Sequence, residues 1–224
     1  MSIKKYLPLL FPVAFMICYI ITHRYLYDFL TTFSCAVIVG VLVVRHKTVV
    51  DWGIIVLAFL FSLAGDRMLF TRAGSEIRFM YGIALFFAAH LFYIFFCLKN
   101  GRWSIRFFCL LLVCYMAYFF IALMPNISNG VLLTAVCLYI LVSCFSVAAA
   151  WGLSLDKATQ MLFFIGIVCL VFSDTLISIR EFLHQQLLYT LMLPTYYASQ
   201  ILVSAACIYS LTRNPGNNFS MKGK

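Results

Sequence analysis

The chain has 224 residues, of which 65% are hydrophobic and only 10% are charged. Soluble domains usually carry about 25% charged residues, so this composition excludes a soluble enzyme and indicates an integral membrane protein. The formal net charge of +9 does not predict nucleic-acid binding, because the basic residues are spread over the short segments between apolar runs, where membrane topology requires them.

Eight segments are apolar over roughly the 17–25 residues that a membrane-spanning helix needs. We therefore predict an all-α fold, in which residues 1–224 form a single integral membrane domain. The first segment follows the basic start MSIKKY, which resembles a signal peptide, but no small-residue cleavage site follows it, so we expect a retained helix. The expected helices of this eight-helix transmembrane bundle span residues 7–22, 27–44, 52–70, 79–98, 105–123, 131–150, 158–179 and 188–211.

The lysines and arginines indicate the orientation of these helices. With eight spans, both termini lie on the same side of the membrane. If that side is cytoplasmic, 11 Lys and Arg residues fall in cytoplasmic segments and 5 in external segments. Because basic residues are enriched in cytoplasmic segments, we predict that both termini are cytoplasmic and that the protein lies in a cell (inner) membrane.

The nine cysteines nearly all fall within the apolar runs, and none belongs to a CxxC pair. We interpret them as small apolar side chains and not as disulfides or metal ligands.

The third segment contains Asp66, in the sequence FSLAGDRML. A charged side chain in hydrocarbon costs roughly 2.5–3.5 kcal/mol on insertion scales and marks a candidate functional site. Ser62 lies four residues earlier and is expected to share its helix face, and Gly65 permits close helix approach. The alternatives are a polar contact that only joins helices and a salt bridge to Arg67 or Arg72.

The fourth segment carries His90, a single intramembrane histidine flanked by small residues in FFAAHLFY. It is expected near the middle of the bilayer, either as a site residue or as a structural hydrogen-bonding group.

A second intramembrane acid, Asp174, lies near the end of the seventh segment in LVFSDTLIS. The eighth segment contains LPTYYASQ, in which Pro194 can open the helix backbone toward a cavity. Tyr196 and Tyr197 precede Gln200 by four and three residues, so the three side chains can line one surface. An aromatic belt at the membrane interface is the alternative for Tyr196.

The third and fourth segments resemble the seventh and eighth. A loose alignment places Asp66 on Asp174 and His90 on Gln200, with 24 and 26 residues between the members of each pair. An offset of four helices preserves direction, so the two halves would be parallel repeats about an axis along the membrane normal. Chance similarity between aromatic-rich helices is the alternative.

Familiar cofactor and catalytic motifs are not found in the sequence. A zinc site needs three or four ligands, and no HxxxH spacing supports one; GxSxG, P-loop and GxGxxG motifs do not occur either. We therefore expect neither a metal nor an organic cofactor.

Four segments, in order along the chain, resemble the YhhN family of eight-span membrane proteins, which includes the animal lysoplasmalogenases. They are SLAGDRML (62–69), FFAAHLFY (86–93), FSDTLI (172–177) and PTYYASQILV (194–203). The resemblance implies hydrolysis of the vinyl-ether bond of a lysolipid substrate, a lysoplasmalogen, to a fatty aldehyde and a glycerophospho-base. The polar positions that match the family are Asp66, His90, Asp174, Tyr197 and Gln200.

This chemistry suits paired carboxyl groups. A vinyl ether is hydrolysed by proton delivery to its β-carbon and by water addition to the resulting oxocarbenium ion, so it needs one protonated acid and one carboxylate. Two carboxyl groups in one pocket can share a proton, as in glycosidases. We assign Asp66 and Asp174 as the catalytic pair, with either as the donor. The residues expected to position water or substrate are Ser62, His90, Tyr196, Tyr197 and Gln200.

Other functions remain open at this point. Parallel repeats with polar residues at middle depth also suit a lipid or small-molecule transporter, and a lipid-binding scaffold is a third possibility. Arg67, Arg72 or Arg78 could contact a lipid head group at the outer interface. Release of aldehyde from lysoplasmalogen by the purified protein would separate an enzyme from both alternatives.

Overall fold

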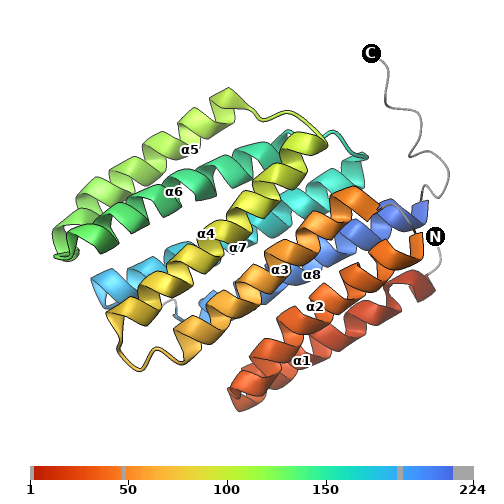
Figure 1. Cartoon of the computed structure of the whole chain (residues 1–224), viewed down its shortest axis with the longest axis horizontal. Coiled ribbons are helices and arrows are strands. Elements are labelled where there is room, and N and C mark those ends of the chain that lie inside the picture. Colours follow the sequence, from red (N-terminus) through yellow and green to blue (C-terminus); the bar gives the residue numbers. More distant parts are fainter. Residues whose placement is uncertain (1–2, 47–48, 186–188, 214–224) are drawn as a thin grey trace.

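The computed structural model describes residues 3–46, 49–185 and 189–213. In these ranges, eight helices are long and apolar enough to cross a membrane (Figure 1), which confirms the all-α fold with eight spans. Residue 188, the predicted start of the eighth span, lies outside the described residues. The helices are α1 (Leu10–Thr22, preceded by a 3-10 turn, Ile3–Leu9), α2 (Tyr25–His46), α3 (Val49–Phe70), α4 (Glu76–Lys99), α5 (Ile105–Tyr118), α6 (Gly130–Trp151), α7 (Lys157–Leu183) and α8 (Tyr189–Arg213).

Polar side chains set the starts of the middle helices. Ser75, Ser104, Asn129 and Asp156 each accept a hydrogen bond from a backbone N–H in the first turn of α4, α5, α6 and α7. Such caps satisfy N–H groups that have no partner within the helix. The starts of these four helices therefore follow from local sequence.

The fifth predicted segment is regular only in part. After α5 the chain forms a π-helical turn, η2 (Phe119–Leu123), and then a 3-10 turn, η3 (Met124–Asn126). Pro125 lies in this second turn and has no backbone N–H to donate. The altered winding turns the end of this span onto α7, which η2 contacts.

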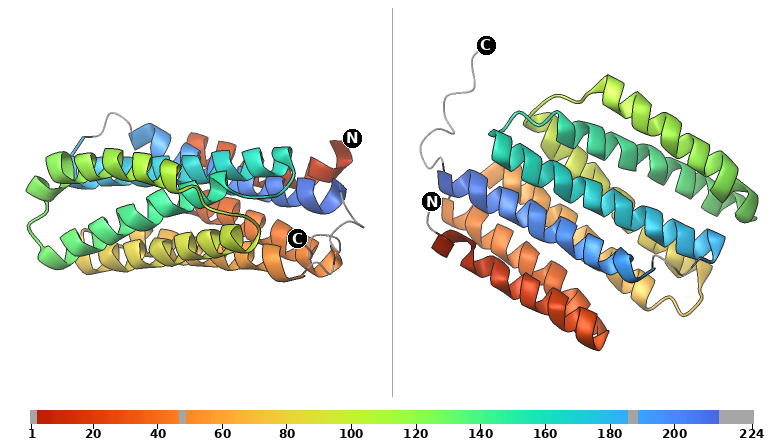
Figure 2. Two further views of the ribbon diagram at one scale, coloured as in Figure 1. Left: turned by 90° about the horizontal axis from the view of Figure 1, so that it is seen from above. Right: turned by 180° about the vertical axis from the view of Figure 1, so that it is seen from behind.

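Six of the helices form a closed ring. In ring order they are α2, α3, α4, α6, α7 and α8, and α8 packs against α2 to close the ring. Helix α1 lies outside the ring against α2 and α8, and α5 lies outside against α6 (Figure 1). Figure 2 shows α1, α8 and α7 on the face opposite α3 and α4. Intramembrane polar residues on different ring helices can therefore meet inside the ring.

Glycines allow the close approach of α3 and α4. A Cβ atom added to Gly65 would lie 2.8 Å from the Phe86 ring, and one added to Gly82 would lie 2.6 Å from Leu69. Both distances are shorter than real Cβ contacts, so a larger residue at either position would require the Phe86 or Leu69 side chain to shift. Gly65 thus packs closely against α4, as the sequence indicates.

Aromatic side chains fill the end of the ring at which α3 and α7 begin and α4 ends. The Trp52 and Phe96 rings are 4.7 Å apart between centroids, and those of Phe96 and Phe163 are 5.1 Å apart. All three side chains are buried. This half of the ring is packed, so any cavity for a ligand must lie in the other half.

The orientation predicted from the basic residues can be tested on two exposed loop positions. In a variant with the nine native cysteines replaced, Ser128→Cys and Ser154→Cys lie at opposite ends of the bundle, before α6 and after it. We expect a membrane-impermeant thiol reagent added to intact cells to label position 128 and not position 154. Labelling of position 154 alone would show that the topology is the inverse of the predicted one. Permeabilised cells, in which both positions should react, serve as the control.

Candidate active site

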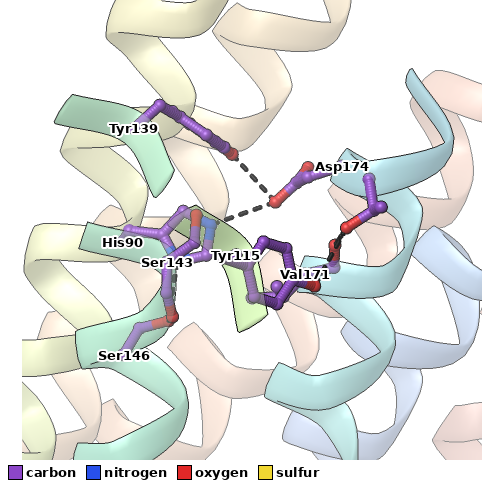
Figure 3. A network of polar contacts seen from close by, with 8 residues as sticks. His90, Tyr115, Tyr139, Ser143, Ser146, Val171 and Asp174 are labelled. Atoms are coloured by element: carbon purple, nitrogen blue, oxygen red, sulfur yellow. Dashed lines mark hydrogen bonds and ion pairs between the residues drawn. The ribbon is translucent and has the colours of Figure 1, made fainter. Parts of the chain in front are cut away.

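Asp174 of α7 interacts with side chains from two other ring helices (Figure 3). Tyr139 of α6 donates a hydrogen bond to Asp174 Oδ2 at 2.9 Å, and Nε2 of His90 on α4 lies 3.1 Å from the same oxygen. The His90 side chain is 1% exposed and that of Asp174 is 10% exposed. The carboxyl group is therefore nearly buried and is held from two sides.

The second ring nitrogen of His90 determines how protons are distributed in this cluster. Nδ1 lies 3.0 Å from Ser146 Oγ, and the Ser146 hydroxyl donates to the Ser143 carbonyl oxygen at 2.8 Å. A hydroxyl has a single proton to donate, so Ser146 must accept its hydrogen bond from Nδ1–H. The contact between Nε2 and Asp174 then holds one proton, either on the imidazole or on the carboxyl group. His90 and Asp174 thus form a proton-sharing pair.

Two consecutive tyrosines of α8 hold two more carboxyl groups. The Tyr196 hydroxyl donates to Asp66 Oδ2 at 2.8 Å, and the Tyr197 hydroxyl donates to Asp28 Oδ1 at 2.8 Å. Successive helical residues point in directions about 100° apart, so adjacent tyrosines can reach α3 and α2 at the same time. Both acids are buried, at 8% and 7% exposed.

All three acids, Asp28, Asp66 and Asp174, line one cavity of about 730 Å³. This volume lies within the roughly 300–1,000 Å³ that small-molecule sites usually have. The lining also includes Arg72, which follows the end of α3, and Arg180, near the end of α7. The cavity therefore runs from the buried acids to one end of the bundle.

A smaller apolar pocket of about 70 Å³ adjoins this cavity at Asp174. It lies among α4, α5, α6 and α7, and its walls are mostly aliphatic and aromatic side chains. The residues that line both spaces are Leu69, Phe79, Phe86, Asp174 and Ile177. Asp174 thus lies where a polar space meets an apolar one.

Of the residues predicted from sequence, Asp66, Asp174 and Tyr196 line the large cavity, and His90 reaches it through Asp174. Tyr197 does not line it but holds Asp28.

Ser62 and Gln200 do not line the cavity. Both are fully buried, and neither side chain makes a hydrogen bond in the described part of the chain, although both lie close to Tyr93. Of the three side chains expected to line one surface, Tyr196 is the one that lines this cavity. The proline in α8 does not bring Gln200 to the cavity, because residues three or four positions apart lie about one helical turn apart along the helix axis.

The salt-bridge alternative for Asp66 does not match the contacts. Arg72 pairs with Glu181 at 2.6 Å, and the Arg67 guanidinium lies 6.0 Å from the centroid of the Tyr25 ring. Asp66 instead accepts its hydrogen bond from Tyr196, a neutral donor.

Asp28, Tyr139 and Ser146 were not predicted from the sequence. Asp28 follows His23 and Arg24 closely at the start of the second span, where a charged residue is not unusual. Its signal was nevertheless present, since it is an acid within the first turn of a long apolar segment. Tyr139 and Ser146 had no such signal, because hydroxyl side chains are frequent in this chain.

The proposed repeat gains no support from these contacts. His90 touches the acid of the other half, Asp174, whereas Gln200, its aligned partner, makes no hydrogen bond among the described side chains. The repeat stays a prediction. Within the described residues, no group of three or more His, Cys, Asp or Glu side chains is arranged to hold a metal ion.

These features define a polytopic α-helical membrane protein with a cluster of buried carboxyl groups at the base of an intramembrane cavity. The YhhN family model matches residues 23–207, which is most of the chain, and the protein belongs to the YhhN family. The matched region begins before Asp28 and so contains all three acids. No curated protein and no solved structure matches the chain.

The buried acids generate a prediction about stability. Replacing Asp66 or Asp174 by Asn keeps the shape of the side chain and relieves the desolvation of a buried charge. We expect each variant to be inserted and folded, with an unfolding temperature at or above that of the wild type. Thermal unfolding of the purified variants in detergent checks this, and a fall of more than a few degrees in both would show that the acids are structural.

Proposed function

We propose that the protein is an intramembrane hydrolase that cleaves the vinyl-ether bond of lysoplasmalogens to a fatty aldehyde and a glycerophospho-base. One observation carries the proposal: buried acids from α2, α3 and α7 surround a cavity that continues, past Asp174, into an apolar pocket. In a lysoplasmalogen, the vinyl ether joins an apolar chain to a polar glycerol. The apolar pocket would correspond to the chain, and the cavity of the acids would correspond to the glycerol. Membership of the YhhN family is consistent with this activity.

The geometry orients such a substrate. The alkenyl chain lies in the apolar pocket between α5, α6 and α7, with its remainder in the hydrocarbon of the bilayer, and the glycerol lies in the larger cavity. The β-carbon of the vinyl ether is on the chain side of the ether oxygen. It therefore lies beside Asp174, which borders both spaces, and the ether carbon and oxygen lie toward Asp66.

This orientation gives the two acids different roles, which sequence alone left open. In the first step, Asp174 transfers the proton that it shares with His90 to the β-carbon. The double-bond electrons form the new C–H bond, and the adjacent carbon becomes an oxocarbenium ion. The negative charge of Asp66, oriented by Tyr196, stabilises that cation.

Water then adds to the cationic carbon, and Asp66 takes the proton that the water releases. The hemiacetal collapses as Asp66 returns this proton to the glycerol oxygen, the C–O bond breaks, and the remaining hydroxyl proton returns to the His90–Asp174 pair. One water is consumed, one aldehyde and one alcohol form, and both acids regain their starting states. General acid–base steps of this kind typically contribute about 10²–10⁴-fold each.

The test is aldehyde release from lysoplasmalogen by the purified protein in detergent, where transport across a membrane cannot contribute. We expect Asp66→Asn and Asp174→Asn each to lower turnover by at least about 10³-fold, because each removes a proton-transfer group. Groups that act as one unit are non-additive, so the double variant should be little worse than either single variant. Near-wild-type turnover in both single variants would exclude this mechanism and favour a transporter or a lipid-binding scaffold.

His90 is assigned a supporting role, so its loss should have a smaller effect. We expect His90→Ala to lower kcat by about 10²-fold, the low end of a general acid–base contribution, because Asp174 keeps its hydrogen bond from Tyr139. The matched control is His46→Ala. His46 is the last residue of α2 and does not line the cavity, so this variant should behave as wild type. A wild-type kcat in His90→Ala would show that the proton shared by His90 and Asp174 has no part in the mechanism.

A further inference from the structure

The cavity that contains the acids ends in a second polar space. A pocket of about 270 Å³ is lined by Arg72, Arg180, Glu181 and His184. The first three of these residues also line the cavity of the acids, so the two spaces are continuous. Both lie where α3 and α7 end, which is the open end of the bundle.

The side chains at this mouth are held in place. Arg72 pairs with Glu181 at 2.6 Å, and each side chain is 27% exposed. The Arg72 guanidinium also lies 5.1 Å from the centroid of the Phe79 ring, a contact that favours a cation over an aromatic face. A guanidinium fixed on two sides loses little conformational freedom when it binds a ligand.

The charges are separated along the cavity. The mouth carries two guanidinium groups, Arg72 and Arg180, against one carboxylate, Glu181, whereas the base of the cavity carries three acids. An anionic group is therefore attracted to the mouth and repelled from the base. Arginine binds phosphate through paired N–H donors more strongly than neutral side chains do.

We propose that Arg72 and Arg180 bind the phosphodiester of the substrate's head group, so that the site selects a single-chain ether phospholipid over a phosphate-free ether glycerol. This inference rests on the proposed function and names what that site recognises. Glu181 acts as a positioning residue, since it orients Arg72 and leaves one face of the guanidinium for the phosphate.

The distance between the mouth and the acids fits such a substrate. Asp174 and Arg180 are six residues apart on α7, which is a rise of about 9 Å along the helix. That span is comparable with the extended path from phosphorus through the glycerol and the ether oxygen to the vinyl carbons. A phosphate bound at the mouth thus places the scissile bond beside Asp66 and Asp174.

The first experiment compares two substrates that differ only in the phosphate. Purified wild type, Arg72→Gln and Arg180→Gln are assayed in detergent micelles with 1-alkenyl-glycerophosphoethanolamine and with 1-alkenylglycerol. We expect each variant to raise KM for the phospholipid at least about tenfold with little change in kcat, and to leave both constants for the alkenylglycerol within about twofold. Arg78→Gln is the control, because Arg78 is exposed, donates to the Thr71 carbonyl oxygen and does not line either space.

Equal losses on both substrates would show a structural role, and no loss on either would show that the arginines do not bind the head group; both outcomes overturn the proposal. The assay is repeated with anionic phospholipid added to the micelles. If Arg72→Gln raises KM only when that lipid is present, the arginines bind the added lipid and not the substrate, and the proposal is wrong.

The second experiment is independent of hydrolysis. Saturated ether analogues, 1-alkyl-glycerophosphoethanolamine and 1-alkylglycerol, cannot be cleaved by this mechanism, and a bound ligand raises the unfolding temperature. We expect the phospholipid to stabilise wild type more than the alkylglycerol does, and Arg72→Gln or Arg180→Gln to remove this difference. If wild type releases no aldehyde but is stabilised more by the phospholipid than by the alkylglycerol, the proposed reaction is wrong and the head-group site is supported. If wild type releases aldehyde but both ligands stabilise it equally, the reaction is supported and the head-group site is wrong.

Discussion

The constraint on which this structure depends is that ionisable side chains inside a bilayer must pair with other groups of the protein. Each of the three buried acids meets this constraint through a side chain distant in sequence: Asp66 through Tyr196, Asp28 through Tyr197, and Asp174 through His90. These contacts connect α8 to α2 and α3, and α4 to α7. The same hydrogen bonds that make the acids tolerable therefore join the helices of the ring.

The rest of the fold divides into a packed half and an open half. Trp52, Phe96 and Phe163 fill the ring near the two termini, and glycines in α3 and α4 allow their backbones to lie close together. Buried aromatic side chains dominate the energetics of such cores. The packed half thus supplies the rigidity, and the cavity in the other half can hold polar groups and a ligand in fixed positions.

Most of the fold could be predicted from the sequence, because hydrophobic length and capping residues are local signals. The eight spans, the close approach at Gly65 and the intramembrane acids Asp66 and Asp174 all follow from such signals. The partners of the acids did not, since the order of the helices in the ring determines that Tyr139 meets Asp174 and that Tyr197 meets Asp28. Helical spacing alone also could not show whether Gln200 lines the cavity, because spacing gives the face of a helix and not the neighbour that the face meets.

The presence of a third acid, Asp28, is best understood through the charge that develops during the proposed reaction. A neutral vinyl ether gains little from a cluster of carboxyl groups, whereas the oxocarbenium ion that forms from it is attracted to every ionised one. An interaction that is stronger in the transition state than in the ground state lowers the barrier. Tyr197 holds Asp28 on the wall of the same cavity as Asp66, so its charge adds to that field without a need for direct contact. The arginines at the mouth have the opposite sign and lie farther from the cation. Under this proposal, separation of the two signs along the cavity would let one site bind an anionic head group and stabilise a cationic intermediate.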